Sequence, residues 1–147
     1  MLTDTMLSTI KEHAERAGVF GDVVLRAGTL VCHAKDAAAP ASYRLFSERG
    51  RIWVALVMAD RWLSESIESD LMHTGDKIED LLAEELAELG EPPADLRVEH
   101  FRSDDLLFTF RTPIPPTAAS SIPAVVHWLL AHEACFRRLG DIGGDGP

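Results

Sequence analysis

His100 and Arg102 are the residues of this chain whose types and spacing best suit a binding chemistry. They lie two positions apart in a stretch that alternates like a β-strand, so both side chains should project from one face, with Glu99 on the opposite face. An imidazole and a guanidinium side by side could bind an anion or the carboxylate of a peptide. The alternative is a solvated strand face on which the two side chains bind nothing.

The other histidines and the cysteines form no metal or catalytic motif. His127 and His132 are five residues apart on an expected helix and so point in different directions, and Phe136 stands where an HExxH zinc motif needs its second histidine. Cys32 and Cys135 form no CxxC pair and are expected to be buried apolar groups. The sequence also has no phosphate-binding loop and no nucleophile motif. We therefore expect no cofactor, no metal and no enzymatic activity.

Four apolar residues are candidate contacts for a partner protein: Val24, Leu45, Trp53 and Trp128. Trp128 lies off the main apolar stripe of the last expected helix, and a tryptophan outside the core often anchors an interface. A wide core face that includes Trp128 explains its position equally well. The sequence does not decide between the two interpretations.

The first element that must support these residues is an amphipathic helix. Apolar residues recur at three- and four-residue steps and predict a helix over residues 4–17. Thr3 or Asp4 can cap its start, and Gly18 stands where a helix often ends, because glycine accepts positive φ without strain.

Strands follow this helix. Residues 23–32 are rich in β-formers around Gly28 and predict either one bent strand or a small hairpin. Residues 43–58 predict a hairpin with a tight turn at Arg49-Gly50. Its second strand is a continuous apolar run, which is typical of a central strand covered on both faces.

The second half of the chain predicts helices on either side of a second hairpin. Asp76, with Glu79 three residues later, resembles a capping box at the start of a helix. Ser120 or Ser121 can cap the last helix. The expected elements are helices over about 61–72 and 77–89, strands over 96–102 and 106–111, and a helix over 122–139.

Composition favours one soluble domain over residues 1–140, followed by a glycine-rich tail over 141–147. The net charge of −10 disfavours nucleic acid as a partner and favours a basic or amphipathic protein. No apolar run approaches the roughly 20 residues needed to span a bilayer, and the first residues lack the pattern of a signal peptide. We therefore expect a cytoplasmic protein that does not enter a membrane.

The order of these elements resembles the fold of type III secretion chaperones and of the related YbjN-type bacterial family. The segments that carry the resemblance are the helix 4–17, the hairpin 43–58, the acidic helix 76–89, the hairpin 96–111 and the helix 122–139. The run 60–68 also looks like a family signature, although its residues suggest no role. The resemblance implies a cytoplasmic homodimer that holds an extended or helical segment of another protein. The break at Gly75 departs from the single helix usual in such chaperones.

The sequence therefore predicts an α+β fold in the order α-β-β-β-α-β-β-α, with an antiparallel sheet of about five strands packed against helices. The predicted function is a non-catalytic, chaperone- or adaptor-like module that binds a protein or peptide client as a homodimer. The alternatives are a small-molecule or enzymatic site around His100 and Arg102, or a structural subunit of a larger assembly.

Overall fold

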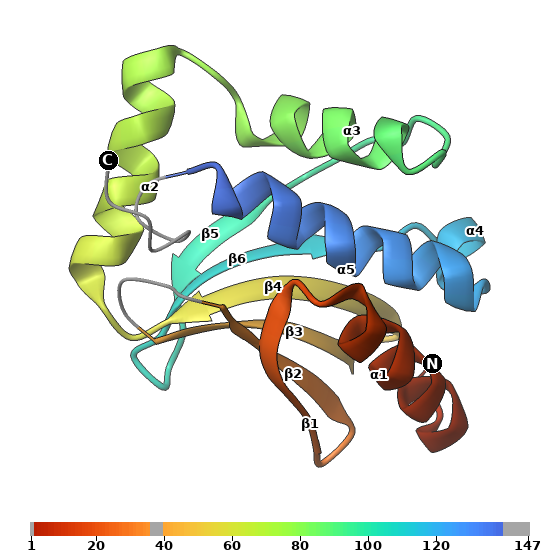
Figure 1. The fold of residues 1–147 in the computed structure, drawn as a ribbon. Helices are drawn as coiled ribbons and strands as arrows, with labels where there is room; N and C mark the ends of the chain where they lie inside the picture. Colours follow the sequence, from red (N-terminus) through yellow and green to blue (C-terminus); the bar gives the residue numbers. More distant parts are fainter. Residues whose placement is uncertain (1, 36–39, 140–147) are drawn as a thin grey trace.

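The computed structural model describes residues 2–35 and 40–139, which form a six-stranded antiparallel sheet and five helices (Figure 1). The strand order is β1-β2-β3-β4-β6-β5. The elements in chain order are α1 (Asp4–Ala17), β1 (Phe20–Arg26), β2 (Thr29–Ala34), β3 (Ala41–Glu48), β4 (Arg51–Met58), α2 (Arg61–Thr74), α3 (Ile78–Glu88), β5 (Glu99–Arg102), β6 (Phe108–Pro113), α4 (Pro116–Ala119) and α5 (Ile122–Arg137).

This architecture confirms the predicted α+β class, with six strands in place of about five. The extra strand arises because residues 20–34 form a hairpin and not one bent strand. Ala27 and Gly28 at its turn both have positive φ, and so do Arg49 and Gly50 between β3 and β4. Positive φ at both central residues is what a two-residue type I′ turn requires, so both hairpins close tightly.

The helix ends follow local signals in most places. The Thr3 hydroxyl accepts a hydrogen bond from the Met6 N–H and caps α1, and Gly18 ends that helix in the left-handed conformation. Asp60 caps α2 by accepting from the Leu63 N–H, and Gly75 ends it. The break predicted at this glycine therefore separates two helices.

The predicted capping box at the start of α3 is wrong. The N-cap is Lys77, which makes no side-chain capping bond. The Glu79 carboxylate instead accepts a hydrogen bond from the Val98 N–H at 3.1 Å. Glu79 therefore forms a contact with a residue 19 positions away in place of the expected local one. This hydrogen bond attaches the chain that leads into β5 to α3.

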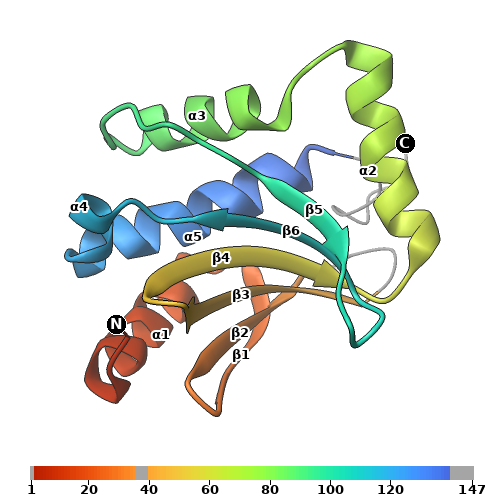
Figure 2. The same ribbon diagram turned by 180° about the vertical axis from the view of Figure 1, so that it is seen from behind.

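The helices cover one face of the sheet in two layers. α1 and α5 lie against the strands, and α3 packs on α5 (Figures 1 and 2). Leu45, Val54 and Leu56 project into the core beneath them and are fully buried. α4, a single turn that the sequence did not predict, precedes α5, which Ser121 caps through the Ala124 N–H.

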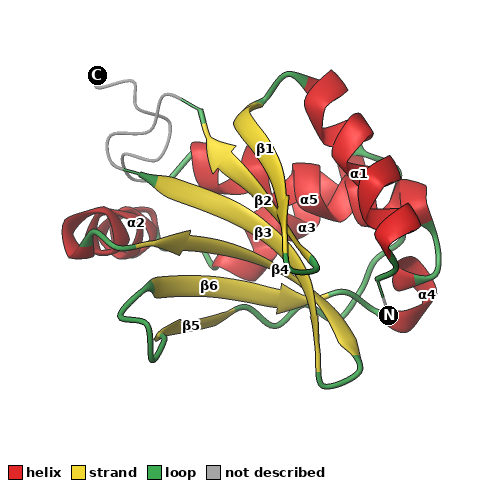
Figure 3. Ribbon diagram, turned by 90° about the horizontal axis from the view of Figure 1, so that it is seen from below, coloured by secondary structure: helices red, strands yellow, loops and turns green. Residues whose placement is uncertain are grey.

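No helix covers the opposite face among the described residues, as the view from below shows (Figure 3). We call this surface the open face. The continuous apolar run of β4 had predicted coverage on both faces, and this is a correction. Ala55 and Val57 project from the open face yet are only 0% and 7% exposed, because neighbouring side chains shield them. The predicted tail over 141–147 lies outside the described residues.

Candidate functional site

The open face contains a groove of about 450 Å³, lined by residues of five adjacent strands and of the turn between β5 and β6. We call it the open-face groove. Its lining residues are Thr29, Arg44, Phe46, Glu48, Ala55, Val57, Phe101, Arg102, Ser103, Asp104, Asp105, Leu107, Thr109 and Arg111.

The floor of the groove is mainly apolar, with one threonine, and two aromatic rings also line the groove. Ala55, Val57 and Thr109 form the floor and are all below 10% exposed. Phe46 is half-buried and Phe101 is 37% exposed, so both rings keep surface available to a ligand. A hollow with an apolar base and partly exposed rings suits the side chains of a bound peptide.

Arg111 is the most strongly held charged group of the groove. Its Nε donates to Glu99 at 2.8 Å and its Nη1 donates to Glu48 at 2.7 Å. The guanidinium lies 4.1 Å from the ring centroid of Trp53 and 5.1 Å from that of Phe101. Burial lowers the pKa of Arg111, but the hydrogen bonds to the two carboxylates outweigh burial and raise it. This cluster is organised before any ligand arrives.

Arg44 is placed differently, although it lines the same groove. Its Nε donates to the Ser42 hydroxyl at 3.1 Å, and it forms no ion pair with any carboxylate in the described part of the chain. Burial and the positive charge of Arg26 lower the pKa of Arg44, with Asp105 acting in the opposite direction. Of the three arginines that line the groove, Arg111 is ion-paired with two carboxylates, whereas Arg44 has no ion pair among the described residues.

The four predicted partner contacts separate onto the two faces. Val24 and Trp53 are half-buried on the open face, where Val24 pairs with Val31. Leu45 was predicted as a partner contact, and this is a correction, because its side chain is 0% exposed in the core. Leu45 alternates with Arg44 and Phe46 along β3, so its side chain points toward the helices. Trp128 is 2% exposed, which decides in favour of the wide core face of α5.

His100 and Arg102 do project from the same face of β5, since they pair with Phe110 and Phe108. Both ring nitrogens of His100 are engaged, by Glu68 at 2.8 Å and by the Ser64 hydroxyl at 3.1 Å, and the ring stacks on Phe110. Burial lowers the pKa of His100, with Glu68 opposing. A carboxylate thus already occupies the position predicted for an anion.

This contact also gives a role to the run 60–68, which had none in the sequence. Asp60 caps α2, Leu63 and Ile67 are fully buried, and Ser64 and Glu68 bind His100. The segment therefore attaches α2 to the edge strand β5.

His132 and the two cysteines are buried and structural. His132 is fully buried, and its nitrogens contact the Trp128 carbonyl at 2.7 Å and the Thr112 hydroxyl at 3.0 Å. Burial raises the pKa of Cys32 and of Cys135 to about 12, so both thiols are poor nucleophiles. Within residues 2–35 and 40–139, no three potential metal ligands come together.

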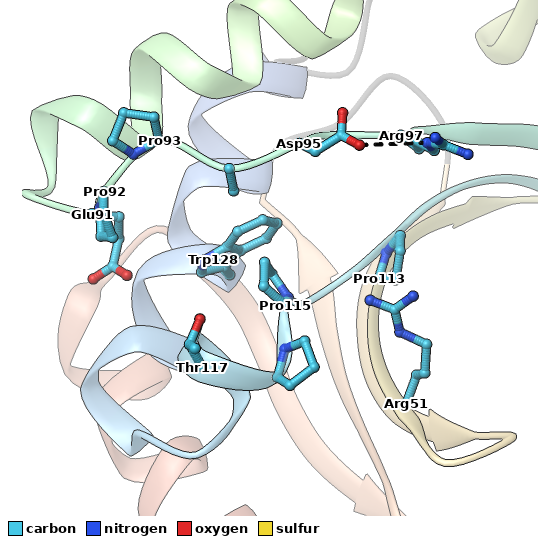
Figure 4. Close-up of a pocket in the computed structure, with 13 residues that line it drawn as sticks. Arg51, Glu91, Pro92, Pro93, Asp95, Arg97, Pro113, Pro115, Thr117 and Trp128 are labelled. Carbon is cyan, nitrogen blue, oxygen red and sulfur yellow. Dashed lines mark ion pairs between the residues drawn. The ribbon is translucent and has the colours of Figure 1, made fainter.

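A second hollow, of about 470 Å³, lies at the end of α5 beside the chain that leads into β5 (Figure 4). Trp128 and Pro115 lie at its centre in this view, and Asp95 and Arg97 form an ion pair of 3.8 Å at its rim. Both members of that pair are more than 80% exposed, so this rim offers little fixed charge. The open-face groove, with buried charge and an organised cluster, is the better candidate site.

The sequence did not point to the groove, although it contained one usable signal. In the strand 43–48, the positions that alternate with the core residues carry Arg44, Phe46 and Glu48. This alternation already places a ring and two opposite charges on the strand face that does not enter the core.

Comparison of the chain with known protein families, with characterised proteins and with solved structures finds no match. The described helices include none that is both long and apolar enough to cross a membrane. The function of this chain is therefore inferred from its own geometry.

Proposed function

We propose that this protein is a non-catalytic binding module, chaperone- or adaptor-like, that holds a segment of a partner protein on the open face of its sheet. The observation that carries the proposal is the open-face groove, in which partly exposed Phe46 and Phe101 flank a mainly apolar floor that none of the described helices covers. Rings held in place by a rigid sheet lose little freedom on binding, which favours affinity.

The surroundings of the groove suit an extended polypeptide. The β5–β6 turn beside it exposes Leu106 to 62% of its surface, so apolar surface continues beyond the groove. β1 and β5 are edge strands, whose unpaired backbone groups can bind an added strand. A client could therefore combine backbone pairing at an edge with side chains seated in the groove.

The proposal includes a homodimer in the cytoplasm. Trp62 is 59% exposed and Met72 85% exposed, both on α2, so we expect α2 to contribute to a contact between two copies. Light scattering over a range of concentrations tests this, and Trp62→Ser should shift the mass toward the monomer. Cys32 and Cys135 are both free and buried, which accords with a reducing compartment.

The binding proposal is tested with a displayed library of random twelve-residue peptides. We expect the wild-type protein to select peptides, and the double variant Phe46→Ser, Phe101→Ser to lose at least tenfold in affinity for them. Leu89→Ser is the matched control, because Leu89 at the end of α3 is 37% exposed, like Phe101, and its loss should leave affinity unchanged. Selected peptides that bind the double variant as tightly as the wild type would rule out the open-face groove.

One observation favours the second candidate, an enzymatic site around His100. The Ser64 hydroxyl, the His100 ring and the Glu68 carboxylate form a chain of contacts at 3.1 and 2.8 Å, the spacing of a Ser-His-acid triad. With the proton on Nδ1, the ring donates to Glu68 and accepts from Ser64. Ser64 is only 3% exposed, which favours a structural role over that of a nucleophile.

A fluorophosphonate probe separates these two roles. A triad nucleophile should be labelled at Ser64, with labelling lost in Ser64→Ala and in His100→Ala. Absence of labelling in folded wild-type protein would leave the three side chains as the attachment between α2 and β5.

A further inference from the structure

We propose that the open-face groove prefers acidic segments, in which an Asp or Glu side chain lies beside an apolar one, and that Arg44 binds the carboxylate. This inference rests on the proposed function and names the chemical class of the client. It differs from the expectation drawn from net charge alone, which favours a basic partner.

Two of the three arginines that line the groove, Arg111 and Arg44, differ in their partners. Arg111 is bound by two carboxylates and contacts two aromatic rings. Arg44 is half-buried, it donates to the neutral Ser42 hydroxyl, and it forms no ion pair with a carboxylate of the described residues. A guanidinium that has lost part of its water and has no counter-ion is unfavourable. An anion delivered by a ligand removes that penalty.

Charged residues of both signs act on Arg44. Arg26, at the end of β1, adds positive potential at the same place. Asp105 on the β5–β6 turn is the acidic residue that acts on Arg44, while Glu48 is engaged by Arg111. The lowered pKa of Arg44 supports this account, because burial and Arg26 both act against its charged form. A carboxylate of a ligand at this place would be attracted by Arg44 and Arg26, with Asp105 opposing.

Arg44 lies on an inner strand of the sheet, next to the aromatic part of the groove. It lies on β3 between Val31 of β2 and Ala55 of β4, and Phe46 follows two residues along the same face. A carboxylate bound at Arg44 therefore places a neighbouring side chain of the ligand over Ala55, beside Phe46. Short-range contacts of this kind decide selectivity, whereas the net charge of −10 acts mainly on the rate of encounter.

The test uses the peptides selected by the wild-type protein from the random library. We expect enrichment of Asp or Glu next to an aromatic or aliphatic residue. The best such peptide is then synthesised with its acid and with the matching amide, and both are titrated against the wild type, Arg44→Gln and Arg61→Gln. Arg61 lies on α2 and is exposed, so it is the control for loss of one positive charge.

The wild type and Arg61→Gln should bind the acid form about tenfold or more tightly than the amide form, as a charge-assisted hydrogen bond predicts. Arg44→Gln should bind both forms alike, and Arg44→Lys should keep only part of the preference because lysine cannot form a bidentate contact. Thermal melting of each variant verifies that it is folded.

Four results would overturn the inference. Peptides that require Phe46 and Phe101 but show no acidic preference, or that keep the preference in Arg44→Gln, would leave the proposed function standing without this selectivity. Selection of basic peptides would reverse its sign. A wild-type dimer that dissociates in Arg44→Gln would assign the groove to a second copy of the chain. Peptides indifferent to Phe46 and Phe101 would instead count against the proposed function itself.

Discussion

The two faces of the sheet share the same strands but carry different chemistry. The helix-covered face is almost entirely apolar and closed. Both ring nitrogens of the buried His132 on α5 have partners there, whereas the Tyr43 hydroxyl has none among the described residues. The open face carries arginines, carboxylates and partly exposed rings around a groove. Stability therefore depends mainly on the covered face, and the open face has side chains available for recognition. Substitutions on the two faces should separate these properties.

The largest effect is expected from Leu45→Ala on the covered face. Leu45 is 0% exposed, so truncation leaves a cavity and should lower the free energy of unfolding by about 2–5 kcal/mol. Val24→Ala on the open face should cost less than about 1 kcal/mol, because Val24 is only half-buried. Urea denaturation measures both. Equal costs at the two positions would remove the distinction between the faces.

The next effect is a pH dependence of stability that originates on the covered face. Burial lowers the pKa of His132 to about 4 from its ordinary value of 6.5. The unfolded chain therefore binds this proton first as pH falls. The stabilising contribution is complete above pH 6.5 and is lost as pH falls toward 4, by about 3 kcal/mol. His100 acts in the same direction, whereas burial raises the pKa of Glu133, which acts in the opposite direction.

Urea denaturation at several values between pH 7.5 and pH 4 measures this loss. His132→Gln should be less stable at neutral pH but should lose less stability on acidification, because glutamine does not titrate. Parallel curves for the variant and the wild type would show that other groups carry the pH dependence.

The sequence predicted the elements whose signals are local. Thr3, Gly18 and Ser121 act on neighbouring backbone groups, so the helix ends could be placed without knowledge of the fold. The capping box expected from Asp76 and Glu79 does not form, since Lys77 is the N-cap of α3. Glu79 instead accepts a hydrogen bond from Val98, which only the folded chain brings near.

The candidate site was harder to predict because its residues come from separate strands. Arg111 meets Glu48, 63 residues away, only through the order β3-β4-β6. Leu45 was wrongly expected to contact a partner, because the burial of a strand residue depends on which face of the sheet the helices cover. The alternation of β3 was visible in the sequence, but the covered face was not.

A smaller effect is expected at Arg111 on the open face. Arg111→Gln removes two ion pairs and the contact with the Trp53 ring, and it leaves Glu48 and Glu99 near each other. Both carboxylates are nearly half exposed, so water screens them and the cost should be about 1 kcal/mol. Added salt should reduce this cost. A loss as large as that of Leu45→Ala would make the open face part of the stabilising core.

The smallest effect on stability is expected from Arg44→Gln, which sharpens the comparison because Arg44 lines the same groove as Arg111. Arg44 has no carboxylate partner among the described residues, and burial together with Arg26 disfavours its charge. Removing the charge should therefore change the free energy of unfolding by less than about 0.5 kcal/mol, or increase it slightly. Urea denaturation beside Arg111→Gln measures the difference. A cost above about 1 kcal/mol would mean that the free protein already satisfies this guanidinium, and a ligand carboxylate would then gain little by binding it.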